Sequence, residues 1–248
     1  VLTYDMDAVD ALLERAKAEI DSDPVDATVD FLPGNSVPFR FTDEREGRRL
    51  STDALRERIE TSILSLTPVT ETLKPEAVRP QVYRAELEGA IVLRSRIVVP
   101  LSGSEAAQAN AALAAAVLNG LRVDAGETLS FNQTVGLRTS EAGYQAAEEP
   151  AYGQNVSGVG GGVCQVSTAL YRLALLGGLE IGERNAAVYP VDYCGIGQEA
   201  AVSDQGLDLK IVNSTGMPVF LTARVYADGD GQTMELQLIG LELDESYT

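Results

Sequence analysis

The sequence predicts an α+β protein made of two parts, a small N-terminal module and a larger C-terminal domain. Within residues 5–65, a helical apolar pattern is followed by two alternating patterns and a second helical pattern. Residues 66–81 contain three prolines and few apolar side chains, which is typical of a linker or of a loosely packed extended segment. From residue 207 onward the apolar residues alternate, as they do in β-strands. We therefore expect a module with its linker at residues 1–81 and a domain at residues 82–248.

The N-terminal module is predicted to contain two helices and a β-hairpin. Residues 5–20 place apolar side chains on one helical stripe, which consists of Val9, Leu12, Leu13, Ala16 and Ile20. Two alternating segments, residues 25–31 and 37–41, flank a Pro-Gly-Asn turn and are expected to pair. Ser51 is placed to cap the second helix, at residues 52–64.

The C-terminal domain is predicted to begin with a long strand at residues 82–99. A capping box from Ser102 to Glu105 then starts an alanine-rich helix, which stops at Asn119 and Gly120. Another helix is predicted at residues 163–176, where two glycines end it. An antiparallel β-meander of three strands is expected at the C-terminal end, at residues 207–211, 219–225 and 234–238.

The composition excludes several classes of partner. The chain has 37 acidic and 19 basic residues, a net charge of −18, so its surface repels nucleic acid and anionic lipid. The longest apolar run has eight residues, 111–118, whereas a membrane span needs about 20. The chain starts at Val1, and we expect any membrane anchor to lie in a segment outside this fragment. With two cysteines and no histidine, neither a metal site nor a cofactor is expected.

The most informative motif is a run of three glycines, residues 160–162, that leads into Cys164 at the start of a predicted helix. Helix N-termini favour thiolate, and they offer N–H groups to an oxyanion. A nucleophilic cysteine also needs a base, usually histidine, and this chain has none. Cys164 is therefore interpreted either as a candidate nucleophile or as a small residue packed at a tight helix start.

The neighbouring residues leave further alternatives open. Cys164 and Cys194 are thirty residues apart and form a disulfide if the fold brings them together. Gly161 and Gly162 belong either to an anion-binding nest or to a tight, closely packed turn. Arg138 either clamps a ligand carboxylate or forms a structural salt bridge.

Other polar residues are predicted to line the same cleft and to contact a ligand. They are Asn132, Thr139, Gln165, Ser167 and Tyr193. Ser167 is equally able to form a hydrogen bond within its own helix. Tyr193 is equally able to pack in the core, because the chain contains no tryptophan.

Several segments occur in the order typical of one family. They are residues 119–120, 125–132, 135–139, 143–144, 160–171, 189–193 and 207–213. Over about residues 90–240 the chain resembles the VanW family. The first module is similar to a peptidoglycan-binding domain that often precedes VanW domains. The resemblance implies an envelope protein of a Gram-positive-type bacterium, at the extracellular face and commonly anchored in the membrane, with peptidoglycan or other cell-wall material as partner.

The chain departs from the family pattern at the residues that bear on catalysis. The family commonly has a His-x-His-Ser stretch where this chain has residues 185–188, and an aspartate where it has Glu199. Cys164 and a carboxylate, Glu199, are therefore present without an imidazole. We expect a non-catalytic protein that recognises peptidoglycan or an envelope partner. The alternatives are a cysteine-dependent acyl-transfer enzyme or hydrolase acting on stem peptides, and a structural adaptor between membrane and wall.

Overall fold

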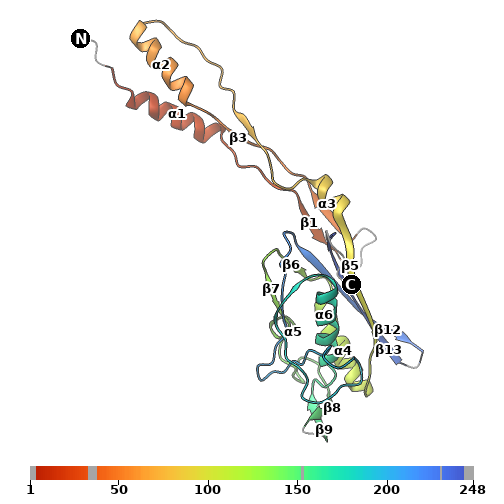
Figure 1. Ribbon diagram of the computed structural model, residues 1–248. Helices are drawn as coiled ribbons and strands as arrows, with labels where there is room; N and C mark the ends of the chain where they lie inside the picture. Colours follow the sequence, from red (N-terminus) through yellow and green to blue (C-terminus); the bar gives the residue numbers. More distant parts are fainter. Residues whose placement is uncertain (1–3, 33–37, 152–153, 230, 243–248) are drawn as a thin grey trace. The chain divides into compact units, whose positions relative to one another are not determined.

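The computed structural model in Figure 1 describes residues 4–32, 38–151, 154–229 and 231–242. It is a mixed α and β structure with antiparallel sheets, which confirms the predicted fold class. The chain divides into two compact units. The first unit contains residues 1–30 and 40–89, and the second contains residues 31–39 and 90–248.

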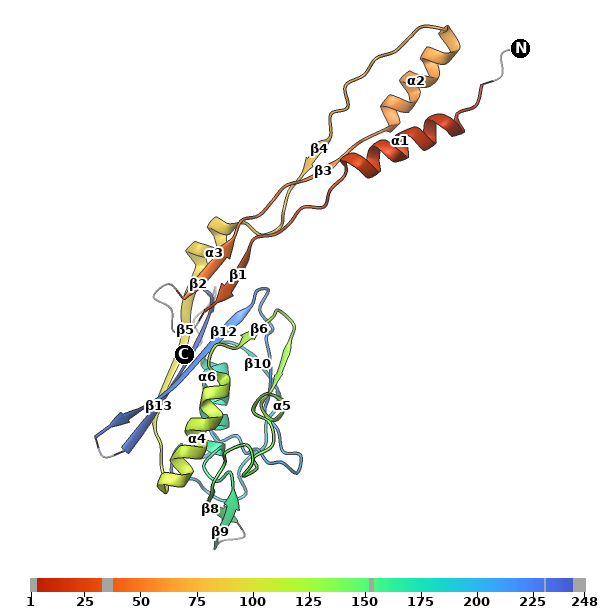
Figure 2. The ribbon, with the colours of Figure 1, turned by 180° about the vertical axis from the view of Figure 1, so that it is seen from behind.

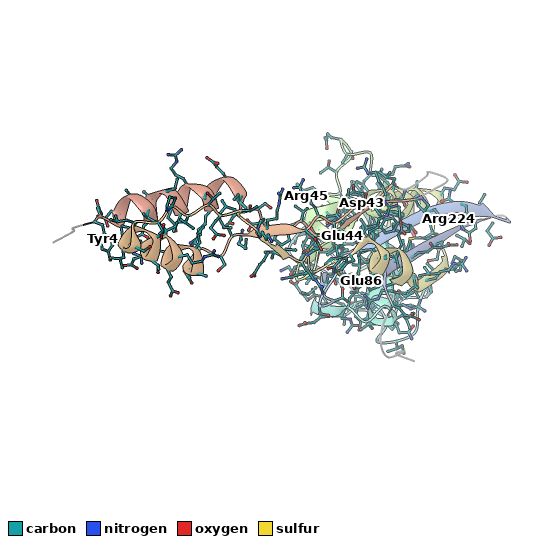
Figure 3. The ribbon with its side chains drawn as sticks, turned by 90° about the horizontal axis from the view of Figure 1, so that it is seen from above. Tyr4, Asp43, Glu44, Arg45, Glu86 and Arg224 are labelled. Carbon is teal, nitrogen blue, oxygen red and sulfur yellow. The ribbon has the colours of Figure 1, made fainter. Side chains whose placement is uncertain are left out.

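Two helices form one end of the first unit, α1 (Asp7–Ile20) and α2 (Asp53–Ser65), both close to their predicted positions. Their buried apolar area is small, because α1 buries only Leu13 and α2 buries no residue. Polar contacts join the helices instead. Arg56 donates to both carboxylate oxygens of Asp10, at 2.6 and 3.1 Å, and the Tyr4 hydroxyl donates to Glu60 at 2.8 Å (Figure 3). Thr52, rather than the predicted Ser51, precedes α2, and its side chain makes no capping bond.

Short antiparallel strand pairs complete this part of the chain. The predicted hairpin is confirmed as β1 (Thr28–Phe31) and β2 (Phe39–Thr42), while its turn at residues 33–35 lies outside the described residues. A second pair, β3 (Gly47–Arg49) and β4 (Glu76–Val78), is visible in Figure 2. β4 lies within residues 66–81 and agrees with the extended alternative predicted for that segment.

The long strand predicted at residues 82–99 is wrong in its first part, where the chain forms the helix α3 (Arg84–Ala90). Alanine, glutamate and leucine favour helix over strand, and Leu87 is buried at 2% exposure. Arg84 also pairs with Glu88 one turn later at 2.8 Å. The strand β5 (Ile91–Pro100) begins only after this helix.

The second unit is organised around a four-stranded antiparallel sheet. Its order is β5, β13 (Gly231–Leu241), β12 (Val219–Asp228) and β6 (Arg122–Val123). Alternate residues of β13, namely Met234, Leu236 and Leu238, are at most 1% exposed. They belong to one core with α4 (Glu105–Leu118) and α6 (Cys164–Leu176), which pack on the sheet (Figure 2). Both helices lie close to the predicted ranges.

A smaller three-stranded sheet has the order β10 (Glu180–Glu183), β11 (Lys210–Val212) and β7 (Thr128–Ser130). The short helix α5 (Phe131–Val135) follows β7, and β8 (Ala146–Ala151) pairs with β9 (Gln154–Val159).

The smaller sheet corrects part of the predicted C-terminal meander. β12 and β13 form the expected hairpin, but β11 pairs with β10 and β7 instead of β12. Alternation identifies a strand without specifying its neighbour. The Asn213 amide, which donates to the carbonyls of Val123 and Met217 at 2.9 Å, fixes the chain between the two sheets.

The N-cap of α4 also differs from the prediction. Ser104 is the capping residue, and its hydroxyl accepts from the Ala107 N–H at 3.2 Å. Ser102 lies outside the helix. Its backbone N–H and carbonyl bond the side-chain amide of Gln165 on α6.

A buried carboxylate lies on the sheet face away from α4 and α6. Glu235 on β13 is 2% exposed and accepts from Arg96 at 2.7 Å and from Arg224 at 3.0 Å; Arg224 is labelled in Figure 3. The bond from Arg96 is the largest cause that lowers the pKa of Glu235 from 4.5 to about 2. Because the folded pKa lies below the unfolded one, this contribution to stability is complete above pH 4.5 and disappears as the pH falls toward 2.

We expect Glu235→Gln to lose most of this pH dependence. At pH 7 the free energy of unfolding of the variant should be about 2 kcal/mol lower than that of wild type. This is less than the free energy equivalent to the full pKa shift, because both arginines are at least half exposed. The difference from wild type should shrink as the pH falls below 4.5. Urea denaturation at several pH values measures this, with Asp124→Asn, from an exposed pair with Arg122, as the control. A constant difference at every pH would contradict the assignment.

Candidate functional site

The turn before α6 explains why the sequence has three glycines there. Gly160 has φ of 91° and Gly162 has φ of 102°, which side-chain-bearing residues rarely adopt. A Cβ on Gly160 would lie 2.7 Å from the Cβ of Arg138, and one on Gly162 would overlap the backbone of Ala107. The carbonyl of Gly161 accepts from the Asn110 amide at 2.9 Å. Backbone conformation and close packing, against Arg138 and against α4, thus account for Gly160 and Gly162.

Cys164 is the first residue of α6 and is partly buried. Its thiol donates to the backbone carbonyl of Val202 at 3.4 Å. One turn later the Ser167 hydroxyl donates to the carbonyls of Ala200 at 2.6 Å and Cys164 at 3.1 Å. The Thr168 hydroxyl accepts from the Ala200 N–H at 2.9 Å. The start of α6 is therefore tied to residues 200–202, and the thiol acts as a hydrogen-bond donor within this contact.

Tyr193 lies beside both cysteines and Thr168. Burial, and then the neighbouring Cys164, raise the pKa of its phenol far above the usual value, while the hydrogen bond with Thr168 opposes this rise. At neutral pH Tyr193 is therefore an uncharged phenol and does not serve as a base. Its described contacts are with the protein itself, and its predicted role in lining a ligand cleft stays a prediction.

Cys194 is also a thiol in the structure. Burial raises its pKa first and the nearby carboxylate of Glu199 adds to this, while Arg172 and Arg184 act in the opposite direction. A thiol with a raised pKa stays protonated at neutral pH and is a poor nucleophile. The disulfide between Cys164 and Cys194 stays a prediction.

Glu199 is 9% exposed and lies at the end of the same loop. Its backbone carbonyl accepts from Arg184 Nε at 2.7 Å, and its Oε1 lies 3.4 Å from a terminal nitrogen of that guanidinium. Oε2 is buried and has no hydrogen-bond partner among the described residues. Arg184 also stacks over the ring of Tyr171, at 5.4 Å from its centroid. The carboxylate is thus paired with an arginine rather than with a thiol.

Arg138 and Asn132 form a separate cluster with the loop after residue 202. The guanidinium is 6% exposed, pairs with Asp204 at 2.8 Å and donates to Asn132 Oδ1 at 2.8 Å. The Asn132 amide donates in turn to the carbonyls of Ser203 and Leu207. This geometry favours the structural salt bridge over a carboxylate clamp.

Thr139 and Gln165 also bond the protein's own backbone. Thr139 closes the turn after Arg138, where its hydroxyl accepts from the Ala142 N–H at 3.2 Å. The Gln165 amide donates to the Ser102 carbonyl at 3.1 Å and accepts from its N–H at 2.8 Å. The two bonds between Gln165 and Ser102 hold the segment between β5 and α4 against the start of α6.

The structure therefore brings together only part of the predicted site. Cys164, Ser167, Tyr193, Cys194 and Glu199 lie around the first turns of α6, and we call these five residues the α6 cluster. Sequence reasoning missed Arg184 and Asp204, which complete the ion pairs of Glu199 and Arg138. Neither Arg184 nor Asp204 belongs to a recognisable sequence motif. The excess of acidic residues indicates that a buried arginine will find a carboxylate partner, but it does not indicate which one.

The described residues hold no group of three or more His, Cys, Asp or Glu side chains arranged for a metal ion. None of their helices is both long and apolar enough to span a membrane.

A family model described as VanW like protein matches residues 106–237, which is more than half of the chain. The chain belongs to the VanW family. This result confirms the resemblance predicted from the motifs, and the VanW match contains the whole α6 cluster. The model of the family described as "Putative peptidoglycan binding domain" matches residues 1–69.

Two curated relatives share the VanW region. "Uncharacterized protein YoaR" of Bacillus subtilis (strain 168) is 36% identical over 125 residues, 50% of this chain and 41% of that protein. "Vancomycin B-type resistance protein VanW" of Enterococcus faecalis (strain ATCC 700802 / V583) is 34% identical over 111 residues, 43% of this chain and 40% of that protein. The chain thus spans about two fifths of the length of the relatives it matches. No solved structure matches.

Within this VanW domain, Asn185 occupies the start of the stretch where the family commonly offers histidine. Its side-chain amide donates to Glu183 Oε1 at 3.2 Å and to the Asp208 carbonyl at 2.9 Å, and its backbone carbonyl accepts from the Ala201 N–H at 2.8 Å. Asn185 thus holds β10 against the segment that contacts Cys164. An amide is neither a general base nor a general acid, so the residue contributes position rather than proton transfer.

Proposed function

We propose that this protein recognises peptidoglycan in the cell envelope and catalyses no reaction on it. The match of the first unit to a peptidoglycan-binding domain supports the choice of ligand. The hydrogen bond from the Cys164 thiol to the Val202 carbonyl carries the second half of the proposal. A carbonyl oxygen at this distance repels a thiolate and so favours the protonated thiol, and the chain has no histidine to remove that proton.

The other members of the α6 cluster support the same conclusion. Cys194 and Tyr193 have raised pKa values and stay protonated, and Glu199 is paired with Arg184. The hydroxyl of Ser167 is committed to the backbone of Ala200. Each group that is able to serve in acyl transfer thus has a contact that stabilises the fold.

The proposed place of work is the extracellular face of the envelope, because peptidoglycan lies there. A membrane anchor in a segment outside residues 1–248 would hold the protein near the wall. A large net negative charge suits this location, since it keeps the surface soluble and away from anionic lipid.

A cysteine-dependent acyl-transfer activity is the second candidate function. One observation favours it, namely that Cys164, Cys194 and the buried carboxylate of Glu199 lie in the same cluster. The unpartnered Oε2 of Glu199 is the atom that would have to accept a proton in such a reaction. A purely structural adaptor between membrane and wall is the third candidate.

Sedimentation with purified peptidoglycan tests the proposal. We expect the 248-residue chain to move into the pellet at low and moderate salt. Cys164→Ser should sediment to the same extent, because serine keeps a donor to the Val202 carbonyl. A protein that stays in the supernatant under all conditions would contradict recognition and favour the adaptor.

A further inference from the structure

A groove in the first unit lies along one face of α2 and is separate from the α6 cluster. Its volume is about 180 Å³, enough to hold part of an extended ligand rather than to enclose a whole one. One wall contains Ser51, which precedes α2, and three residues along one face of the helix, Ala54, Leu55 and Arg58. The segment 71–74 forms the opposite wall. Leu50, at the end of β3, is 6% exposed and completes the lining.

The backbone of the extended wall is available to a ligand. Residues 71–74 precede β4, and their N–H and carbonyl groups make no hydrogen bond with any described residue. An extended segment with unpaired backbone groups is able to pair with an incoming peptide, as the edge of a sheet does. The lining contains no aromatic residue on which a sugar ring would stack. The groove therefore suits a peptide better than a glycan.

The charges of the groove select the kind of peptide. Arg58 and Glu71 form an ion pair across the groove and neutralise one another. Lys74 is exposed and makes no ion pair within the described part of the chain. An ammonium group with no carboxylate partner is notable in a protein of net charge −18. It would attract a carboxylate, whereas a basic peptide would find no free acidic group in the lining.

The apolar part of the lining offers a surface for aliphatic side chains. Ala54 is small, Leu55 is half-buried, and Leu73 is 38% exposed beside Lys74. Small aliphatic side chains would cover Leu73 and Leu55, which gains free energy by removing apolar surface from water.

We propose that this groove binds a short extended peptide and that Lys74 receives the carboxylate at its C-terminus. The inference rests on the proposed recognition of peptidoglycan, because it names the peptide stem as the part of the wall that the first unit binds. The backbone of residues 71–74 pairs with the stem, and the ion pair of Arg58 with Glu71 shapes the far end of the groove.

The experiment compares Lys74→Gln with Lys17→Gln in the intact chain. Lys17 lies in the same unit and pairs with Glu14, so both variants remove one positive charge. Binding of a synthetic stem tetrapeptide, L-Ala-D-Glu-L-Lys-D-Ala, is followed in ¹⁵N–¹H spectra, and each variant is also sedimented with peptidoglycan. We expect shifts at Leu55, Leu73 and Lys74. Lys74→Gln should raise the Kd for the tetrapeptide about 3- to 10-fold, and Lys17→Gln should leave this Kd unchanged.

Two further comparisons make the result specific. The tetrapeptide with a C-terminal carboxamide should bind wild type as weakly as the free acid binds Lys74→Gln, and Lys74→Arg should restore most of the affinity. Equal affinities of wild type and Lys74→Gln, or shifts confined to other residues, would overturn this inference. If wild type still sediments with peptidoglycan in that case, the proposed function stands. If wild type does not sediment, the proposed function fails instead, and the tetrapeptide titration still decides the groove.

Discussion

Replacing Gly162 by alanine is expected to lower the free energy of unfolding by about 3 kcal/mol. Two costs add at this position. The backbone has φ of 102°, which an L-residue adopts only with strain, and the new Cβ would overlap the Ala107 carbonyl in α4. Thermal or urea denaturation of the purified chain measures the change.

Gly126→Ala is the matched control, because Gly126 also has a positive φ of 77° but has open space around its Cβ position. It should cost about 1–2 kcal/mol, which isolates the backbone strain. The difference between the two variants then reports the close contact between α4 and the turn before α6. If Gly162→Ala costs no more than Gly126→Ala, this contact does not explain the glycine run.

Arg138→Ala should destabilise the protein by about 2 kcal/mol, because it removes a guanidinium that is 6% exposed from its bonds to the Asn132 carbonyl oxygen and to the Asp204 carboxylate, which water still reaches at 28% exposure. Arg40→Ala breaks an exposed pair with Asp30 and should cost less than about 1 kcal/mol. Urea denaturation compares the two variants at neutral pH.

The Arg138 result also decides between the two roles predicted for this residue. A structural salt bridge predicts a large loss of stability, with peptidoglycan sedimentation of the folded fraction unchanged. A carboxylate clamp predicts the reverse, with normal stability and weaker sedimentation. The geometry favours the first outcome, since both Nε and a terminal nitrogen of the guanidinium are bonded to the protein's own groups.

The sequence predicts the elements that carry strong local signals. α4 and α6 have apolar spacing with clear stops at Asn119 and Gly177, and the β12–β13 hairpin has strict alternation around a glycine-rich turn. α3 was missed because the apolar residues of 91–99 extended the strand pattern backward over a helix of only seven residues. β11 was found as a strand but given the wrong neighbours, because alternation is local whereas pairing depends on distant residues.

The same distinction applies to the site. The motifs located Cys164, Tyr193 and Glu199, which the structure places in one cluster. The contacts that define their chemistry join residues far apart in the sequence. Cys164 bonds the carbonyl of Val202, 38 residues away, and the backbone of Arg138 bonds Asp204, 66 residues away. A backbone carbonyl acceptor leaves no trace in the residue types, so this contact of the Cys164 thiol is apparent only from the fold.

The most direct test of the central claim is to incubate the chain with purified peptidoglycan and to analyse pellet and supernatant together. The account predicts that the protein is found in the pellet and that mass spectrometry detects no newly released or newly cross-linked wall fragments. Cys164→Ser should give the same two results. Wall fragments that form with wild type and not with Cys164→Ser would contradict the account and establish cysteine-dependent chemistry at the α6 cluster.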